Sequence, residues 1–501
     1  MRIRILVSAL ALAASLSAEI TLPAILTDHM VLQRGVPVHL WGKAAPGEAV
    51  SAAFRNSTQG TKADTLGRWS LYLAPGDAGG PFPLTITGTN TISFSDVLVG
   101  DVWVASGQSN MEFQLRQVTN AEAEIAAANY PNIRRIKVTR KPADYPLEDM
   151  TAQGWTSITP QNASGASAVA FFFARHLQEK SSAAGIPQGI IESFWGGTPV
   201  EAWMSLRAIG EEPALSQITA NWARSMEAYP LALARYEQRL AEWNDAAAKV
   251  KTEGKPAPGN KPGAPGTNPG GPWMPAGLYN GMIAPIAPFA IKGAIWYQGE
   301  SNASPQAAGI YGRAFQSMIK DWRRAWGVGD FPFFYVQLAN YKANPFWPEV
   351  REAQRQTLQL TNTGMAVTID VGNPTNIHPT NKQDVGLRLA LAARSVAYGE
   401  KLTYSGPLYR QVSRDGAALR VWFDQTGGGL VAKNGPLNGF EIAGANGTFV
   451  PADAKLDGAS VIVSTGTVSE PVQVRYSWAD DPDGNLYNTE GLPASPFRSQ
   501  P

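Results

Sequence analysis

Apolar, strand-like segments alternate with helical segments between residues 97 and 399, and this alternation restricts the fold more than any other feature of the chain. The strand-like segments are 97–105, 186–194, 290–297, 333–338 and 365–371, and clear helical segments are 166–180 and 311–326. Such alternation predicts an α/β domain with a mainly parallel sheet covered by helices on both faces. Ligands of sheets of this kind bind at the carboxyl ends of the strands.

The regions on either side of this core have a different pattern. Short alternating apolar runs separated by Gly, Pro and Asp turns lie at 36–41, 50–54, 69–73 and 84–88, and again at 419–423, 461–464 and 472–478. They predict an N-terminal β-sandwich domain over 19–96 and a C-terminal β domain over 401–501, flanking a catalytic domain over 97–400. Within that domain, a helical stretch at 218–251 and a Pro- and Gly-rich stretch at 252–271 predict an insertion at about 207–272.

The first eighteen residues have the composition of an export signal. Arg2 and Arg4 precede an apolar stretch at 5–16, and small residues follow, so 1–18 is predicted to be a signal peptide and the mature chain to begin near Glu19. The protein is therefore expected in the periplasm or outside the cell. No later apolar stretch is long enough for a membrane span. With 42 basic and 41 acidic residues, the chain has no general field that would attract nucleic acid.

Ser109 lies where the 97–105 strand ends. A helix predicted over 112–128 would place Ser109 on a strand-to-helix turn, which exposes a hydroxyl and directs helix N–H groups toward it. That position suits a nucleophile whose reaction builds negative charge on oxygen. The alternative is an ordinary helix N-cap, a position that Ser also favours.

A serine nucleophile needs a base, and the chain has only four histidines. His176 lies in a helical pattern, and His29 and His39 lie in the N-terminal β region. His378 follows the 365–371 strand and could meet Ser109 at one edge of the sheet. The chain has no cysteine and therefore no thiol nucleophile. It also lacks HExxH, Walker A and zinc-type Cys/His patterns, so neither a metal ion nor another cofactor is expected.

Several strings resemble the sialate O-acetylesterase family, a branch of the SGNH (GDSL-like) hydrolases that acts on acetylated carbohydrates. They are 26–34 (LTDHMVLQR), 107–111 (GQSNM), 194–203 (FWGGTPVEAW), 296–302 (WYQGESN), His378-Pro379 with Lys382, Val385 and Gly386, and 485–497 (NLYNTEGLPASPF). The resemblance implies an SGNH-type fold, with Ser109 as nucleophile and His378 as general base. It implies a serine esterase that removes O-acetyl groups from carbohydrates through an acyl-enzyme. The G-x-S-x-G elbow of α/β-hydrolases is not met.

Acyl transfer also requires donors for the oxyanion. The N–H of Ser109 is the first, and Gly196 and Gly197 allow backbone to approach closely. Gln298 or Asn302 could supply a side-chain amide, as an amide does in the wider SGNH group. The alternative for the two glycines is a plain turn.

The triad acid departs from the family pattern, because many SGNH hydrolases have Asp three residues before the histidine and this chain has Thr375 there. Either Ser109 and His378 act as a dyad with help from a backbone carbonyl, or Asp370 or Glu300 supplies the charge. We favour the dyad. Glu300 would then hold the loop or a substrate hydroxyl.

Trp203 and Asn302 are candidate substrate contacts, Trp203 because aromatic rings stack on sugars. The substrate is expected to be acetylated sialic acid or an acetylated plant-type polysaccharide or oligosaccharide. An anionic sialate would favour a nearby cation, and the nearest in sequence are Arg116, Lys292 and Lys382. Two alternatives stay open: a carbohydrate-binding protein with a degenerate hydrolase core, and an SGNH lipase or thioesterase.

Overall fold

The computed structural model describes residues 19–256, 258–266 and 268–499, so the predicted signal peptide lies outside the described residues. The central sheet has the strand order β13-β12-β11-β7-β10-β8-β9. Its strands are β7 (Thr91–Gly107), β8 (Tyr130–Lys137), β9 (Thr156–Ile158), β10 (Gln188–Phe194), β11 (Gly293–Tyr297), β12 (Phe333–Val336) and β13 (Thr363–Ala366). Every neighbouring pair from β13 to β8 is parallel, and β9 is antiparallel at the edge. The predicted α/β class with flanking β domains is confirmed.

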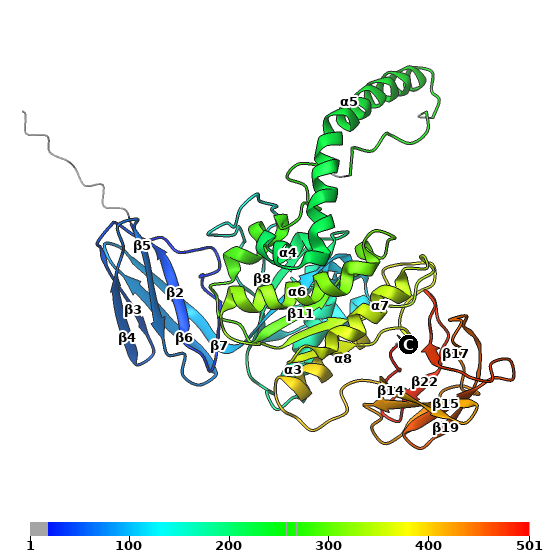
Figure 1. Ribbon diagram of the computed structural model, residues 1–501. Helices are drawn as coiled ribbons and strands as arrows, with labels where there is room; N and C mark the ends of the chain where they lie inside the picture. Colours follow the sequence, from blue (N-terminus) through cyan, green and yellow to red (C-terminus); the bar gives the residue numbers. More distant parts are fainter. Residues whose placement is uncertain (1–18, 257, 267, 500–501) are drawn as a thin grey trace, which may run out of the picture.

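Helices cover both faces of this sheet (Figure 1). On one face, the ring of Trp103 in β7 meets Phe173 of α3 (Ala168–Lys180) edge-on, with centroids 5.1 Å apart. On the other face, Trp296 of β11 packs against Trp322 of α6 (Ala308–Trp326) at 5.7 Å. The body also contains α4 (Leu206–Glu211), α7 (Trp347–Gln356) and α8 (Lys382–Val396). These aromatic contacts fix the sheet between its helical layers.

Strand β7 belongs to two domains at once. Its first part pairs antiparallel with β6 (Gly79–Thr87) of the N-terminal domain, and its last part pairs with β10 and β11. Side chains alternate between exposed and half-buried up to Asp96 and are fully buried from Val97 to Gly107. The change of pattern that predicted a boundary at residue 96 therefore lies inside a continuous strand.

Two sequence-based predictions around the strands were wrong in detail. The single helix over 112–128 is replaced by α1 (Ser109–Glu112), a 3-10 turn (Leu115–Gln117) and α2 (Ala121–Ala126). The helix breaks because Phe113 accepts a hydrogen bond from the Ala168 N–H and Leu115 donates one to the Ala166 carbonyl. Strand β13 ends at Ala366 and not at residue 371, because the chain turns at 369–370, and Val367 and Ile369 are buried outside the strand.

The flanking domains are built from antiparallel strands. The N-terminal domain contains β2 (Val38–Lys43), β3 (Ala49–Phe54), β4 (Ser57–Lys62), β5 (Arg68–Leu73) and β6, and β1 (Val31–Gln33) runs parallel to β7. The C-terminal domain contains β14 (Leu408–Asp415), β15 (Ala418–Asp424), β16 (Leu430–Ala432), β17 (Phe440–Ala443), β18 (Val450–Pro451), β19 (Asp453–Asp457), β20 (Ser460–Ser464), β21 (Gln473–Tyr476), β22 (Leu486–Asn488) and β23 (Phe497–Arg498). It has a hydrophobic core of its own, as a separate domain requires.

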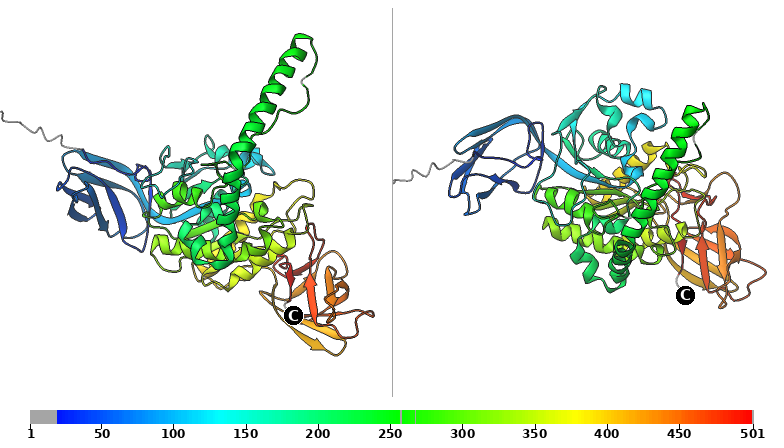
Figure 2. Two further views of the ribbon diagram at one scale, coloured as in Figure 1. Left: turned by 45° about the horizontal axis from the view of Figure 1, so that its top comes forward. Right: turned by 90° about the horizontal axis from the view of Figure 1, so that it is seen from above.

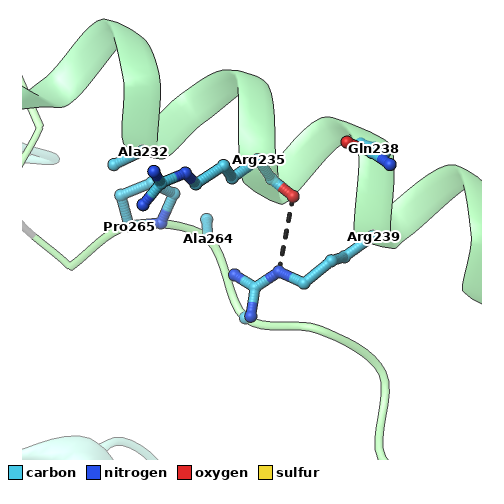
Figure 3. A pocket seen from close by; sticks show the side chains of 7 residues that line it. Ala232, Arg235, Gln238, Arg239, Ala264 and Pro265 are labelled. Carbon is cyan, nitrogen blue, oxygen red and sulfur yellow. Dashed lines mark hydrogen bonds between the residues drawn. The ribbon is translucent and has the colours of Figure 1, made fainter.

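The predicted insertion forms an arm that projects from the body (Figures 1 and 2). Its helix α5 (Ser216–Thr252) buries only Ile218 among its side chains, and the chain then returns along the helix. The Trp243 indole N–H donates to the Gly259 carbonyl at 3.3 Å, which ties the returning segment to α5. Figure 3 shows a shallow cavity between α5 and this segment, beside Arg235 and Pro265. In the described part of the chain, no helix combines the length and apolar content needed to cross a membrane.

One arginine joins the C-terminal domain to the body. The Arg351 side chain on α7 is fully buried, and its guanidinium donates to the carbonyls of Leu338 and Ala339 in the body and of Ala479 and Asp480 in the C-terminal domain, at 2.7 to 2.9 Å. Burial lowers the pKa of this guanidinium to about 9. Two of these carbonyls have a second donor, because that of Ala339 also accepts from the Trp347 indole N–H and that of Asp480 from the Tyr341 N–H. Arg351 is the side chain that joins all four.

Replacing Arg351 by Met should therefore loosen the C-terminal domain. Losing the four hydrogen bonds of the guanidinium should cost about 3 kcal/mol of unfolding free energy, which lowers Tm by about 5 °C or more in differential scanning calorimetry. Arg313→Met, at an exposed position on α6, is the matched control and should leave Tm almost unchanged. Equal Tm values for the two variants would contradict this role.

Candidate active site

The structure brings the predicted nucleophile and base together. Ser109 begins α1 immediately after β7, and His378 lies in the loop between β13 and α8. His378 Nε2 lies 2.8 Å from Ser109 Oγ, a hydrogen bond between residues 269 positions apart. The turn needs glycine at Gly107, where φ is +133° and a Cβ would lie 2.2 Å from the Tyr297 carbonyl oxygen.

The other histidines have different partners. His29 contacts Asp96 at 2.7 Å, His39 contacts the carbonyl of Pro288, and the His176 ring lies near Arg394. Within the described residues, His378 alone of the four forms a hydrogen bond with Ser109. The geometry therefore agrees with the elimination made from the sequence.

The surroundings of His378 favour its neutral form. Burial, helped by the positive charge of Lys382, lowers the pKa of the imidazole from 6.5. The ring stacks against Phe113 with centroids 6.4 Å apart, which accounts for part of that burial. A neutral imidazole can accept the proton of the serine hydroxyl at neutral pH.

Neutral side chains shape the loop that carries His378. Asn373 Oδ1 accepts hydrogen bonds from the N–H groups of Thr375 and Asn376 and from the Thr375 hydroxyl, at 2.9 to 3.0 Å. Asn376 Oδ1 in turn accepts from the His378 N–H at 2.9 Å. Thr375, at the position of the usual triad acid, thus orders the backbone and makes no contact with the ring. His378 Nδ1 has no hydrogen-bond partner, side chain or carbonyl, in residues 19–256, 258–266 and 268–499.

Neither candidate acid binds the imidazole. Both carboxylate oxygens of Asp370 accept from the Arg388 guanidinium, at 2.6 and 2.8 Å, so the suggestion that Asp370 serves as the acid is corrected. Glu300 Oε1 accepts from the Asn110 amide at 2.6 Å, while its Oε2 is buried without a partner among the described residues. Burial raises the pKa of Glu300. Its contact is with the nucleophile's neighbour and not with the base.

Asn110 connects the two catalytic segments. Its amide donates to Glu300 Oε1 and, at 3.0 Å, to the Ile377 carbonyl beside His378. Its Oδ1 accepts from Lys382 Nζ at 2.6 Å. Burial lowers the pKa of Lys382 to about 7, opposed by the charge of Glu300. The sequence analysis did not assign this role, although Asn110 and Lys382 both belong to the strings that carry the family resemblance.

Two backbone N–H groups at or near Ser109 have no hydrogen-bond partner among the described residues. The N–H groups of Ser109 and Gly197 form no hydrogen bond within the described chain. Gly197 has φ of +74°, and a Cβ there would meet nothing within 4 Å, so its backbone borders open space. The Gly196 N–H is committed to Glu112 Oε2 at 3.0 Å, and a Cβ at Gly196 would lie 3.2 Å from Ser109 Cβ. Gly196 therefore lets the loop approach the nucleophile.

Three other predicted site residues are structural, and their assignments are corrected. Gln298 is fully buried and its amide donates to the Thr198 carbonyl and to Asn302 Oδ1, so it has no donor left for an oxyanion. Asn302 is 2 % exposed and donates to Glu201, which excludes contact with a substrate. Trp203 is also fully buried, with its indole N–H donated to Thr198. A single sequence does not show which polar side chains become buried partners of one another.

Comparison with known proteins agrees with this site. Residues 262–396 match a family model described as carbohydrate esterase, sialic acid-specific acetylesterase. The human sialate O-acetylesterase is 32% identical over 430 residues, which cover 77% of this chain and 73% of that protein. The chain belongs to the sialate O-acetylesterase family. The mouse sialate O-acetylesterase is 29% identical over 530 residues, 94% of this chain and 93% of that protein. A crystal structure of a carbohydrate acetylesterase from Xanthomonas citri superposes with a TM-score of 0.81 at 40% identity, covering 96% of this chain and all of that one.

The family identifies the chain as a carbohydrate esterase, and the environment of His378 predicts how its rate depends on pH. Because the base must be neutral and its pKa is lowered from 6.5, kcat/KM should fall on acidification with a midpoint below 6.5. Acetate release from p-nitrophenyl acetate measures this profile, and circular dichroism over the same range checks that the fold persists. A midpoint above 7 would mean that a negative charge stabilises the imidazolium, contrary to the observed surroundings.

Proposed function

We propose that this esterase removes O-acetyl groups from carbohydrates with Ser109 as nucleophile and His378 as general base. The observation that carries the proposal is the 2.8 Å contact between Ser109 Oγ and His378 Nε2 at the carboxyl edge of the parallel sheet. Serine becomes an effective nucleophile when a neighbouring base takes its proton, and His378 has the neutral form that this requires.

The proposed reaction has two halves. His378 Nε2 takes the proton as Ser109 Oγ attacks the acetyl carbonyl, and the Ser109 and Gly197 N–H groups donate to the oxyanion. The imidazolium then protonates the departing sugar hydroxyl, leaving an acetyl-serine. Water, deprotonated by His378, then attacks that ester, and the imidazolium returns the proton to Ser109 Oγ as the acetyl–oxygen bond breaks and acetate leaves. Since neither Asp370 nor Glu300 binds the ring, the two residues act as a dyad.

Acetylated carbohydrate is the substrate class that the relatives support, since they are named as sialate O-acetylesterases and a carbohydrate acetylesterase. Acetylated sialic acid and acetylated plant-type glycans both belong to this class. A purely carbohydrate-binding role fits less well, because a protein without catalysis has no need for the Ser109–His378 contact. Lipase or thioesterase action would need an apolar groove for a long chain, whereas the loop beside Ser109 carries Gly196 and Gly197.

Removing either member of the dyad should abolish hydrolysis. Ser109→Ala and His378→Ala should each lower kcat on acetylated xylo-oligosaccharides by at least about 10,000-fold, and the double variant should be no slower than either, because the two groups act as one unit. Ser216→Ala, at an exposed position on the arm, is the control. A folded Ser109→Ala protein with normal turnover would refute the mechanism.

The two carboxylates near the site provide a separate test of the dyad. Asp370→Asn and Glu300→Gln should each lower kcat by less than about 100-fold, since a true triad acid replaced by its amide costs about 10,000-fold. Asp370→Asn should also lower Tm, because it removes the charge partner of the buried Arg388. If kcat fell about 10,000-fold in one variant while Tm and KM were preserved, that carboxylate would be the triad acid.

A further inference from the structure

Trp273 is an exposed aromatic residue in a segment that is otherwise buried. Its side chain is 41 % exposed, whereas residues 274–278, which follow it, are buried. Large aromatic side chains contribute most when they are covered, so an exposed one on an ordered segment is a candidate contact for a ligand. Trp273 lies on the stretch that returns from the arm to the body.

The indole is hydrogen-bonded to the loop that approaches Ser109. Its N–H donates to the Gly197 carbonyl at 2.6 Å. Gly197 follows Gly196, whose added Cβ would lie 3.2 Å from Ser109 Cβ, and consecutive Cα atoms are about 3.8 Å apart. Gly197 therefore has two proposed contacts: its N–H faces the oxyanion, and its carbonyl accepts the hydrogen bond from Trp273.

The backbone that follows Trp273 is fixed to the body. The Ala276 N–H donates to the Glu201 carbonyl at 2.9 Å, and the Gly277 carbonyl accepts from the Ala143 N–H at 3.0 Å. One edge of the indole is held by Gly197, so the ring is ordered before any ligand arrives. A contact that is already ordered loses little conformational entropy on binding.

Other tryptophans near the site have no comparable free face. Trp203 and Trp296 are fully buried. The Arg140 guanidinium covers the ring of Trp195 at 5.3 Å and also pairs with Glu112, which balances its charge. Among the described residues, no aromatic ring or cation lies over Trp273, and its 41 % exposure leaves surface for a ligand to contact.

We propose that Trp273 forms one wall of a sugar subsite beside Ser109, where its ring stacks on the apolar face of a pyranose that carries or adjoins the acetyl group. This inference rests on the proposed carbohydrate esterase function and specifies how the sugar is held. It also gives the insertion a role, because the segment returning from α5 delivers Trp273 to the site. Specificity for sugar esters over simple esters then depends on a residue outside the dyad.

The test compares a sugar ester with a simple ester. Trp273→Ala should lower kcat/KM on acetylated xylo-oligosaccharides about tenfold, mainly by raising KM, and should lower it much less on p-nitrophenyl acetate. Trp273→Phe keeps an aromatic face and should retain most of the preference for the sugar ester, whereas Trp273→Leu should lose it. Tyr72→Ala removes a similarly exposed ring from β5 of the N-terminal domain and should change neither rate.

An equal loss on both esters, or no loss on either, would overturn the subsite. A measurement without substitution at Trp273 covers the case of poor folding: in the Ser109→Ala protein, acetylated xylo-oligosaccharides should slow oxidation of Trp273 by N-bromosuccinimide, followed by mass spectrometry. Unchanged oxidation at saturating oligosaccharide would also overturn it. Failure of the esterase proposal is distinguishable, because the wild-type protein would then release no acetate from either ester.

Discussion

The site depends on a buried amide placed between two buried charges. Glu300 and Lys382 are both removed from water, which is costly unless each finds hydrogen bonds, and Asn110 provides one to each of them. The same amide also donates to the Ile377 carbonyl, so the nucleophile's neighbour holds the loop of the base. Loss of that bridge would leave two uncompensated charges and would release the histidine loop. The contact between Ser109 and His378 therefore depends on the hydrogen bonds of Asn110, which take no part in the proposed proton transfer.

The absence of a carboxylate at His378 Nδ1, within the described residues, changes how this base must work. A triad acid stabilises the imidazolium, whereas here burial and a neighbouring cation disfavour it. In the proposed mechanism, the charge that forms during attack is therefore offset mainly at the oxyanion. Backbone N–H groups at the start of α1 and in the Gly196–Gly197 loop are suited to that, because they need no rearrangement when the charge forms.

The sequence predicted those features that depend on the local pattern of apolar and polar residues. It did not predict those that depend on contacts between residues far apart in the chain. Ser109 and His378 follow apolar strands, so their placement at one sheet edge followed from periodicity and topology. The 112–128 helix was wrong because the Phe113 and Leu115 backbones pair with residues 166–168, a contact without a local signal. Gln298, Asn302 and Trp203 belong to the strings that carry the resemblance, yet their side chains are buried and form hydrogen bonds to other protein groups. Asp370 is committed to Arg388, which no spacing in the chain reveals. Trp273 was not singled out, because its exposure exists only in the folded loop.

Strand β7 begins in the N-terminal domain and ends two residues before Ser109. Its seventeen residues span about 55 Å at the usual rise of a strand, without a hinge in between. The N-terminal domain is therefore joined to the site through a strand that is hydrogen-bonded in both domains, and no loop linker separates them at this point.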